Sequence, residues 1–412
     1  MKILAVNVFQ SRGSTGSIVT NLLDYLETRG CKTVYCYRDG QQSDNLTQYK
    51  IGSRIETALS YRLGYYFGDR YGFSFFSTAK LIHIIAKERP DLIMLHSING
   101  SYINIYWLLS WIKKHNLPVM FTHHSEYLYT GNCTHAIECD KWKTGCGNCE
   151  HLQEYHISRY IDTSAISYCK MLKAFSGVKQ CCGIGVSPWV MLRAKQSRIM
   201  DGIKQITIEN GVNDAMFYPH EVTSLRTNLG ISSDSKIVLF STALFSNSQN
   251  DIKGGRFILQ LAKAQKNSNI IFLVVALENR VDSVPDNVIV VNAVSEQEIM
   301  AQYYSLADVL ALTSKRETFS MPTAEALMCG TPVVGFYAGG PESIAISEYS
   351  QFVPYGDTML LNNAITQMLT SDLDRCQIAR EAKEKYSRTI MCEKYFSEIV
   401  QLTNEGKNEK SS

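Results

Sequence analysis

Short apolar runs alternate with amphipathic stretches of helical length along most of the chain. In the first half, runs of strand length and stretches of helical periodicity follow one another at residues 2–9, 16–29, 32–37, 92–95, 103–115 and 118–122. The alternation restarts at residues 237–241, 254–266, 270–275, 288–291, 296–305, 309–313 and 332–336. Short, fully apolar strands separated by helices indicate parallel sheets that helices cover on both faces. The pattern therefore predicts two α/β domains in tandem.

The boundary between the predicted domains follows a turn at Asn210-Gly211. An apolar run ends there, and Asn-Gly pairs commonly end strands. We predict an N-terminal domain, a C-terminal domain, a helix that returns to the N-terminal domain and a flexible polar tail, at residues 1–213, 214–385, 386–403 and 404–412.

The composition limits the class of protein. The 412 residues are 45% hydrophobic and 19% charged with a net charge of +2, which is typical of a globular protein and gives no overall charge for binding nucleic acid. The first apolar run has no signal-peptide pattern, and no apolar stretch reaches the roughly 20 residues that span a bilayer. We therefore expect a cytoplasmic protein, in which the 12 cysteines are reduced thiols or metal ligands.

The segment from residue 314 to residue 335 carries the strongest chemical signal. A strand is predicted to end at Thr313 and a helix to begin at Met321-Pro322, because proline is favoured in the first helical turn. A helix that begins just after a strand presents N–H groups and a positive dipole end, which suit a diphosphate. Glu317 precedes this helix and Glu325 lies within it. Because phosphate repels carboxylates, we expect these two to accept hydrogen bonds from sugar hydroxyls.

This segment resembles the family 4 retaining glycosyltransferases of the GT-B fold, whose signature is Glu-x7-Glu followed by Gly-Thr-Pro-Val-Val-Gly, here at residues 330–335. The resemblance implies an α/β protein with two Rossmann-like domains whose parallel sheets face a central cleft. It implies a hexosyltransferase that uses a nucleotide-sugar, either a UDP- or a GDP-sugar, with no obligatory cofactor for catalysis. Glu317 would be the catalytic carboxylate at the transferred sugar, and Glu325 would bind the ribose hydroxyls of the donor.

Further residues of the second half match the donor site of that family. Phe319, Ser320 and Met321 stand at the expected helix start, although the family usually has glycine in place of Ser320. Gly339 and Gly340 resemble the family's Gly-Gly-x-x-Glu loop, whose backbone amides line the sugar-diphosphate pocket.

A lysine-glycine pair supplies the expected positive charge. Lys253-Gly254 resembles the family's pair, in which the lysine takes part in catalysis by neutralising the leaving diphosphate. The family generally has an arginine shortly before this lysine, whereas Ile252 stands here. Arg256 is the candidate replacement in donor binding.

The first half resembles a narrower subgroup of these enzymes, which makes capsule, O-antigen and exopolysaccharide. Gly13 and Gly16 lie in its Gly-Ser-Thr-Gly turn, which faces the donor phosphates, and His96 is expected on the acceptor side. The resemblance implies a saccharide acceptor that is carried on a lipid, for bacterial surface polysaccharide such as lipopolysaccharide.

A histidine pair follows the strand predicted at residues 118–122. His124 matches the catalytic histidine of the subgroup, and a buried structural histidine is the alternative. Ser125 replaces the subgroup's aspartate, and Glu126 is the candidate for that role on the acceptor side.

Four cysteines crowd one short segment, in a loop predicted over residues 130–150. They are Cys133, Cys139, Cys146 and Cys149, and the subgroup resemblance includes them. Four thiolates can hold a structural zinc ion, and the Cys-Gly-Asn-Cys spacing is that of a zinc knuckle. Free thiols in an ordered loop are the alternative.

The stretch at residues 61–76 is unusually aromatic. Tyrosine and phenylalanine mixed with arginine suit a membrane interface or stacking on sugars, and a helix packed on the sheet is the alternative. The membrane interpretation predicts peripheral contact with the inner face of the cytoplasmic membrane.

Two other function classes fit the same motifs. One is a sugar-nucleotide epimerase or hydrolase of the GT-B fold. The other is a catalytically silent subunit, which the missing arginine before Lys253 and the substitution at Ser125 favour, and which the intact pair of glutamates disfavours.

Overall fold

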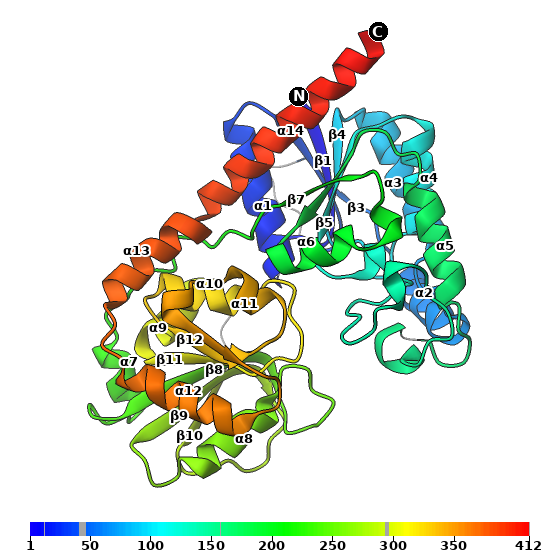
Figure 1. Ribbon diagram of the computed structural model, residues 1–412. Helices are drawn as coiled ribbons and strands as arrows, with labels where there is room; N and C mark the ends of the chain where they lie inside the picture. Colours follow the sequence, from blue (N-terminus) through cyan, green and yellow to red (C-terminus); the bar gives the residue numbers. More distant parts are fainter. Residues whose placement is uncertain (12, 41–46, 157, 293–295, 412) are drawn as a thin grey trace. The chain divides into compact units, whose positions relative to one another are not determined.

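The computed structural model describes residues 1–11, 13–40, 47–156, 158–292 and 296–411 (Figure 1). The chain forms two compact units. Unit 1 comprises Met1–Glu209 and Met391–Ser412, and unit 2 comprises Asn210–Ile390. Unit 1 is therefore made from two separate pieces of chain, whereas unit 2 is one continuous segment.

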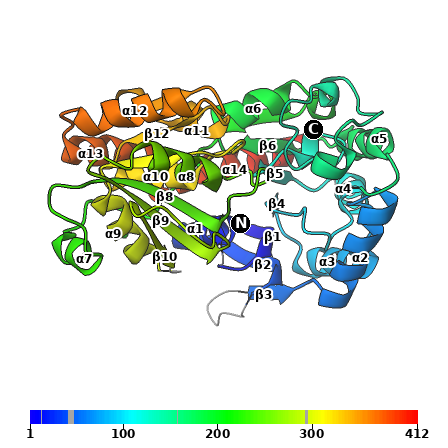
Figure 2. The same cartoon turned by 90° about the horizontal axis from the view of Figure 1, so that it is seen from below.

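Unit 1 is built on a seven-stranded parallel sheet with the order β3-β2-β1-β4-β5-β6-β7. Its strands are β1 (Lys2–Phe9), β2 (Lys32–Asp39), β3 (Thr47–Lys50), β4 (Leu92–Leu95), β5 (Val119–His123), β6 (Cys181–Gly185) and β7 (Lys204–Thr207). Its helices are α1 (Gly13–Thr28), α2 (Arg54–Phe67), α3 (Phe75–Glu88), α4 (Ile105–Lys114), α5 (Ser164–Phe175), α6 (Pro188–Lys195) and most of α14 (Arg388–Ser411). Helices lie on both faces of the sheet (Figure 1, Figure 2). This is why the central strand β1 is buried from Ile3 to Val8 and is apolar there except for Asn7.

Unit 2 repeats this architecture with six parallel strands in the order β10-β9-β8-β11-β12-β13. Its strands are β8 (Lys236–Phe245), β9 (Ile270–Asn279), β10 (Val288–Asn292), β11 (Val309–Leu312), β12 (Val333–Phe336) and β13 (Ser350–Val353). Its helices are α7 (Thr223–Asn228), α8 (Gly255–Ala264), α9 (Gln297–Leu306), α10 (Met321–Met328), α11 (Gly340–Ile344), α12 (Thr358–Thr370) and α13 (Arg375–Tyr386). The core lies between the sheet and helices such as α8 and α12, where Phe240, Phe257 and Phe336 are buried.

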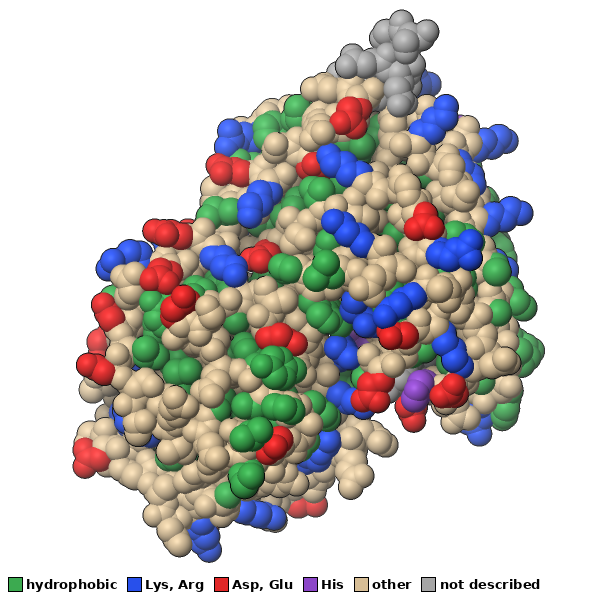
Figure 3. Space-filling view, viewed as in Figure 1, with side chains coloured by type: hydrophobic (Ala, Val, Ile, Leu, Met, Phe, Trp, Pro, Cys, Tyr) green, Lys and Arg blue, Asp and Glu red, His purple; other side chains and the backbone are tan. Residues whose placement is uncertain are grey.

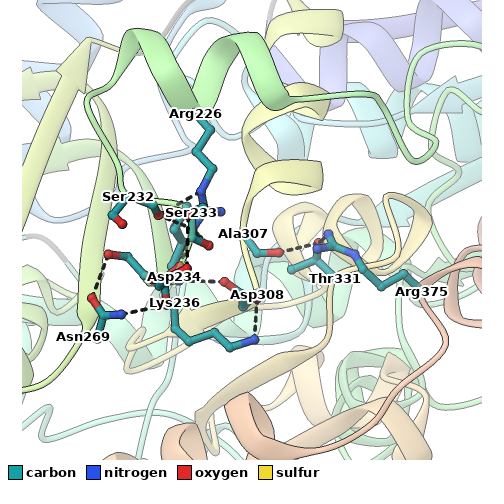
Figure 4. A network of polar contacts seen from close by, with 12 residues as sticks. Arg226, Ser232, Ser233, Asp234, Lys236, Asn269, Ala307, Asp308, Thr331 and Arg375 are labelled. Carbon is teal, nitrogen blue, oxygen red and sulfur yellow. Dashed lines mark hydrogen bonds and ion pairs between the residues drawn. The ribbon is translucent and has the colours of Figure 1, made fainter.

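A polar network closes the amino edge of the unit 2 sheet (Figure 4). Asp308, just before β11, accepts a hydrogen bond from Nζ of Lys236 at the start of β8 at 3.3 Å. Asn269, before β9, donates to a backbone carbonyl of the segment before β8 at 2.7 Å. Arg375, at the start of α13, donates to Oγ1 of Thr331 at 2.8 Å. These side chains hold the amino ends of the strands together. The predicted site residues of unit 2 lie at the opposite, carboxyl edge of the sheet.

The tandem α/β fold predicted from the sequence is confirmed. Each strand predicted from an apolar run overlaps a strand of the structure, including β1 with identical bounds. The apolar run that leads to the Asn210-Gly211 turn overlaps β7, which ends at Thr207. β3, β6 and β13 were not predicted from the sequence.

The chain passes between the units near Glu209 and near Ile390. The boundaries predicted from the sequence lie at residues 213 and 385. The predicted flexible tail over residues 404–412 lies largely within α14, which continues to Ser411. Glutamate and lysine are frequent in that stretch and proline is absent from it, which is compatible with a helix.

Candidate functional site

Three loops of unit 2 meet at the carboxyl edge of its sheet. They follow β8, β11 and β12 and carry the predicted residues Lys253, Glu317 and Gly339, respectively. The backbone N–H of Glu317 donates to the carbonyl of Ala338 at 3.0 Å, and Oγ1 of Thr313 donates to the carbonyl of Lys253 at 2.8 Å. The carboxyl edge of a parallel sheet is where α/β proteins place their ligands.

The side chains of Lys253 and Glu317 form an ion pair at this edge. Nζ of Lys253 contacts Oε1 of Glu317, and Oγ of Ser314 donates to the same oxygen at 2.9 Å. The two side chains remain 40% and 19% exposed, so a ligand can reach both. A lysine and a glutamate held together present one group for an anion and one for hydroxyl donors.

Two glycines let these loops approach closely. A Cβ on Gly254, whose φ is +75°, would lie 2.3 Å from the carbonyl oxygen of Thr313. A Cβ on Gly340 would lie 2.5 Å from the backbone nitrogen of Phe319. Neither position accommodates a side chain, which explains glycine after Lys253 and in the loop after β12.

Glu325, on α10, is partly buried. Oη of Tyr304 donates to its Oε2 at 3.0 Å. Burial raises the pKa of Glu325 to about 7, and the hydrogen bond from Tyr304 opposes the rise. This carboxyl group therefore changes its charge near neutral pH.

The start of α10 is formed by three of the predicted residues. Phe319 is buried, Ser320 is the N-cap, and Met321 is the first helical residue. Oγ of Ser320 accepts a hydrogen bond from Oγ1 of Thr323 at 2.8 Å. Ser320 has a φ of +82°, a conformation that favours glycine, which explains why the resembling family has glycine there.

Replacing Ser320 with glycine is expected to raise the free energy of unfolding by about 0.5–1 kcal/mol, because the relief of the positive φ exceeds the loss of the cap. Urea unfolding measures the change. Ser320→Ala is the contrast, since it keeps the strained backbone and loses the hydroxyl cap, and it should destabilise by about 1 kcal/mol. Loss of stability in the glycine variant would show that the hydroxyl matters more than the backbone conformation.

The loop after β12 uses its own amides. Glu342 accepts hydrogen bonds from the backbone nitrogen of Ala338 at 3.0 Å and from that of Gly339 at 2.7 Å. The nitrogen of Gly340 donates to the carbonyl of Glu317 at 2.9 Å. These amides, which the family resemblance assigns to the donor, bind within the protein here and fix the loop beside Glu317.

Arg256 lies in the first turn of α8. Its guanidinium donates to the carbonyl of Gln249 at 2.9 Å and to Oη of Tyr355 at 3.1 Å, and it stacks on Phe257. These contacts are with the loop before α8 and with Tyr355, whereas Lys253 alone of the two cations contacts Glu317.

In unit 1, the two predicted histidines contact each other at the carboxyl edge of the sheet. Nδ1 of His96 lies 3.1 Å from Nε2 of His124. Burial lowers the pKa of His124 to about 3 and holds that of His96 well below its usual value, so both rings are neutral near pH 7. In this contact one ring donates and the other accepts.

Glu126 has a structural role, which corrects its assignment to the acceptor side. Its side chain is fully buried, and Nε of Arg193 lies 2.6 Å from its Oε1. Oη of Tyr129 and the backbone nitrogen of Ala136 also donate to the carboxylate, at 3.1 Å and 2.8 Å. The three donors leave no exposed oxygen for a ligand, and they fasten the start of the cysteine-rich loop.

Gly13 and Gly16 open α1 beside the carboxyl end of β1. Gly13 has a φ of +65°, and a Cβ on Gly16 would lie 3.1 Å from the carbonyl oxygen of Phe9. Gly13 lines a hollow of about 810 Å³ together with Lys50 and Arg54. The glycines therefore allow the helix start to approach the strand end beside a basic hollow.

The four cysteines of the cysteine-rich loop line one cavity of about 210 Å³. All four are free thiols. Burial raises the pKa of Cys146 to about 12, and the backbone N–H of Gly131 opposes the rise. Among the described residues, no group of three or more His, Cys, Asp or Glu side chains is placed to hold a metal ion.

Zinc binding by these thiols stays a prediction. Metal analysis of protein purified without chelator is expected to give about one zinc ion per chain if the four sulfurs close on the ion as a tetrahedral site. Less than about half an equivalent, with four thiols that react freely with a thiol reagent, would leave them as free cysteines.

Among the described residues, no helix of either unit is long and apolar enough to cross a membrane. On the visible face of the molecule, basic and acidic side chains are interspersed (Figure 3).

Sequence reasoning missed three partners of the predicted residues. Ser314 and Tyr304 hold the two glutamates of the motif, and Arg193 neutralises Glu126. Ser314 was within reach of a local argument, because it lies three residues before Glu317 just after β11. The other two come from distant helices and gave no local signal.

Family models match both halves of the chain. The model described as Glycosyltransferase Family 4 matches residues 15–145, and the model described as Glycosyl transferases group 1 matches residues 223–385. Together the two matches cover more than half of the chain.

Curated relatives match over shorter stretches. A D-inositol 3-phosphate glycosyltransferase of Xylanimonas cellulosilytica is 28% identical over 175 residues, which are 39% of this chain and 40% of the relative. An N-acetyl-alpha-D-glucosaminyl L-malate synthase of Bacillus anthracis is 22% identical over 205 residues, 47% of this chain and 51% of the relative. The chain thus spans about half the length of the curated relatives that it matches, or less.

Solved structures resemble the whole chain. Sucrose-phosphate synthase from Thermosynechococcus elongatus has a TM-score of 0.70 and 20% identity, with 98% of this chain and 99% of that chain covered. Anabaena HepE in complex with UDP-glucose has a TM-score of 0.64 and 14% identity, with 97% and 100% covered. At these identities the likeness shows the fold, and it confirms the GT-B fold expected from the sequence.

Proposed function

We propose that this chain, which carries a family 4 glycosyltransferase domain followed by a group 1 glycosyl transferase domain, is a retaining hexosyltransferase that moves a sugar from a nucleotide-sugar to a saccharide acceptor. The observation that carries the proposal is the Lys253–Glu317 pair at the carboxyl edge of the unit 2 sheet, beside the start of α10. The pair combines a cation for a leaving diphosphate with a carboxylate for sugar hydroxyls.

The proposed roles follow from the charges of these groups. When the donor binds, Lys253 exchanges Glu317 for the diphosphate and stabilises the negative charge that builds up as the anomeric bond breaks. The positive end of α10 adds to this stabilisation. Glu317 then accepts hydrogen bonds from the transferred sugar and positions it. In a retaining transfer the acceptor hydroxyl attacks from the face that the diphosphate leaves.

Of the two donor classes expected from the sequence, we propose a UDP-sugar as the donor. Support comes from the similar structure of HepE, which was solved with UDP-glucose and with UDP and glucose. Glu325 is proposed to bind the ribose, and Tyr304 orients its carboxyl group. No cofactor is required, because Lys253 and the helix dipole supply the positive charge.

A panel of UDP-, GDP- and ADP-sugars tests the proposal on the purified protein, with and without chelator. Thermal shift reports donor binding and nucleotide release reports turnover. One donor should stabilise the protein and be turned over in either condition, and Glu317→Ala should bind it and turn it over far more slowly. Glu298→Ala, which removes an exposed carboxylate on α9, is the matched control. Binding of none of these donors would contradict the proposal and favour a silent subunit.

Donor affinity is expected to fall below neutral pH. Ribose hydroxyls donate to a carboxylate, so binding favours the ionised form of Glu325, whose pKa in the free protein is raised to about 7. The dissociation constant should therefore be constant well above that pH and rise by up to tenfold per unit, roughly, below it. Calorimetric titrations across this range measure the profile. Glu325→Gln should bind more weakly without this dependence, and an unchanged profile in that variant would assign the titration to another group.

The acceptor is proposed to be a lipid-linked saccharide in bacterial surface polysaccharide assembly, on the inner face of the cytoplasmic membrane. The support is an apolar surface on unit 1 over α2 and the start of α3. Its most exposed members are Ile55 and Phe76, each 83% exposed, and Leu59 and Phe67 accompany them. A surface helix normally turns its polar side to water, whereas this one suits a membrane interface.

A further inference from the structure

A basic cavity lies beside the apolar surface of α2 in unit 1. Its volume is about 540 Å³, and its lining includes four arginines, Arg38, Arg54, Arg62 and Arg70. It adjoins the hollow at the start of α1, since Arg54 and Asp39 line both. Nothing in the proposed donor site uses these residues, which belong to the other unit.

The charges of the cavity are not balanced within the described part of the chain. Asp39 is the single carboxylate in the described lining, and the guanidinium of Arg38 binds it at 2.8 Å. Arg54, Arg62 and Arg70 form no ion pair with any described carboxylate. Nε and Nη1 of Arg70 are buried and have no hydrogen-bond partner among the described residues.

Two acidic residues that are close in sequence to the cavity arginines, Glu56 and Asp69, contact groups outside its lining. Glu56, on α2, accepts a hydrogen bond from the backbone nitrogen of Phe76 at 2.8 Å and caps the start of α3. Asp69 contacts Nζ of Lys170. Three guanidinium groups in the lining of one cavity give it a positive charge that attracts an anion. Their planar forks match phosphate oxygens in particular.

Exposed apolar side chains lie beside the cavity on the same helix. Arg54 and Arg62 lie on α2, as do the exposed apolar side chains of Ile55 and Leu59. Tyr61, on the same helix, lines the cavity and is also exposed. The helix buries only Ser60 and Gly64. A cationic cavity with an apolar rim fits an amphiphile that has an anionic head and a hydrocarbon chain.

We propose that the arginine cavity binds the diphosphate of a lipid-linked acceptor while the apolar side chains of α2 and the start of α3 enter the membrane surface. The inference rests on the proposed function, because it identifies the acceptor of the transfer. Arg70 contacts the diphosphate from inside the cavity, and Arg54 and Arg62 contact it from the rim. Arg38 stays bound to Asp39 and to the carbonyl of Gly100 and supports the wall.

Vesicle binding by the full chain tests the proposal. Three vesicle types are compared: phosphatidylcholine alone, phosphatidylcholine with phosphatidylglycerol, and phosphatidylcholine with a polyprenyl diphosphate at the same surface charge. The protein should bind the third type most tightly, and inorganic diphosphate should compete. The double variant Arg54→Gln/Arg62→Gln should lose about tenfold in affinity for it. Both side chains are exposed, so the variant is expected to fold.

A matched double variant controls for the loss of charge. Lys195→Gln/Arg198→Gln removes two exposed cations of unit 1 that do not line the cavity, and it should bind as the wild type does. Equal binding to both anionic vesicle types would overturn the proposal in favour of general attraction to anionic lipid. Binding of inorganic diphosphate without any vesicle preference would overturn it in favour of a water-soluble phosphorylated acceptor.

The donor experiment keeps the two proposals apart. The thermal shift caused by a nucleotide-sugar reports unit 2, and it should be the same in the wild type and in Arg54→Gln/Arg62→Gln. If no nucleotide-sugar shifts the wild type, the proposed function fails whatever the vesicles show. If the shift is present and the double variant binds polyprenyl diphosphate vesicles as the wild type does, the arginine cavity alone is contradicted.

Discussion

Replacing Lys253 with alanine is expected to lower the turnover of the nucleotide-sugar donor by about 10²–10³-fold, because a preorganised charge at the leaving group is lost. Steady-state nucleotide release measures it. The ion pair with Glu317 is partly exposed, so its loss costs little folding free energy and the variant should unfold near the wild-type temperature. The effect should fall mainly on kcat, since the diphosphate gains its full charge only as the anomeric bond breaks.

Two further variants define the role of this lysine. Lys263→Ala removes an exposed lysine on α8 and should leave turnover unchanged. Lys253→Arg keeps the positive charge and should recover part of the rate. Turnover of Lys253→Ala within about twofold of the wild type would show that another group stabilises the leaving diphosphate.

Replacing Glu126 with alanine is expected to lower the free energy of unfolding by about 3–5 kcal/mol, because it leaves the guanidinium of Arg193 without its buried partner. Nη2 of Arg193 already lacks a described hydrogen-bond partner, and the guanidinium lies over the ring of Trp142. Urea unfolding measures the loss.

The pair can also be replaced as a whole. Glu126→Leu/Arg193→Met should be more stable than Glu126→Ala, since no charge then remains buried. Glu150→Ala breaks an exposed ion pair with Lys141 in the same loop and should leave the unfolding midpoint unchanged. A small loss in Glu126→Ala would return Glu126 to consideration as a ligand-binding group.

The central strands could be predicted from the sequence because both of their faces are buried. β11 is therefore wholly apolar and β1 mostly so, and each run indicates a strand without knowledge of its neighbours. β6 has glycine at Gly183 and Gly185, and a Cβ on the latter would lie 2.7 Å from Cε of Met191. Another element fills the space that an apolar side chain of β6 would otherwise occupy. The strand therefore lacks the apolar run by which strands are recognised in a sequence.

The site divides in the same way into local and distant parts. Glu317, Glu325 and the start of α10 lie within one motif, and adjacent residues were enough to place them together. The role of Glu126 depends on Arg193, which is 67 residues further along the chain. The lining of the basic cavity comes from a strand end, a helix and a loop. Only the folded structure shows that these segments lie together.

The discontinuity of unit 1 has a consequence for synthesis on the ribosome. Tyr395 and Ile399 of α14 are buried in unit 1, and Oη of Tyr395 lies 3.1 Å from Oγ1 of Thr122 on β5. The first unit to begin emerging therefore lacks part of its core until α14 has left the exit tunnel, whereas the segment 210–390 can fold earlier. A chain that stops near Ile390 would consequently contain an incomplete unit 1, although every residue of unit 2 had been made.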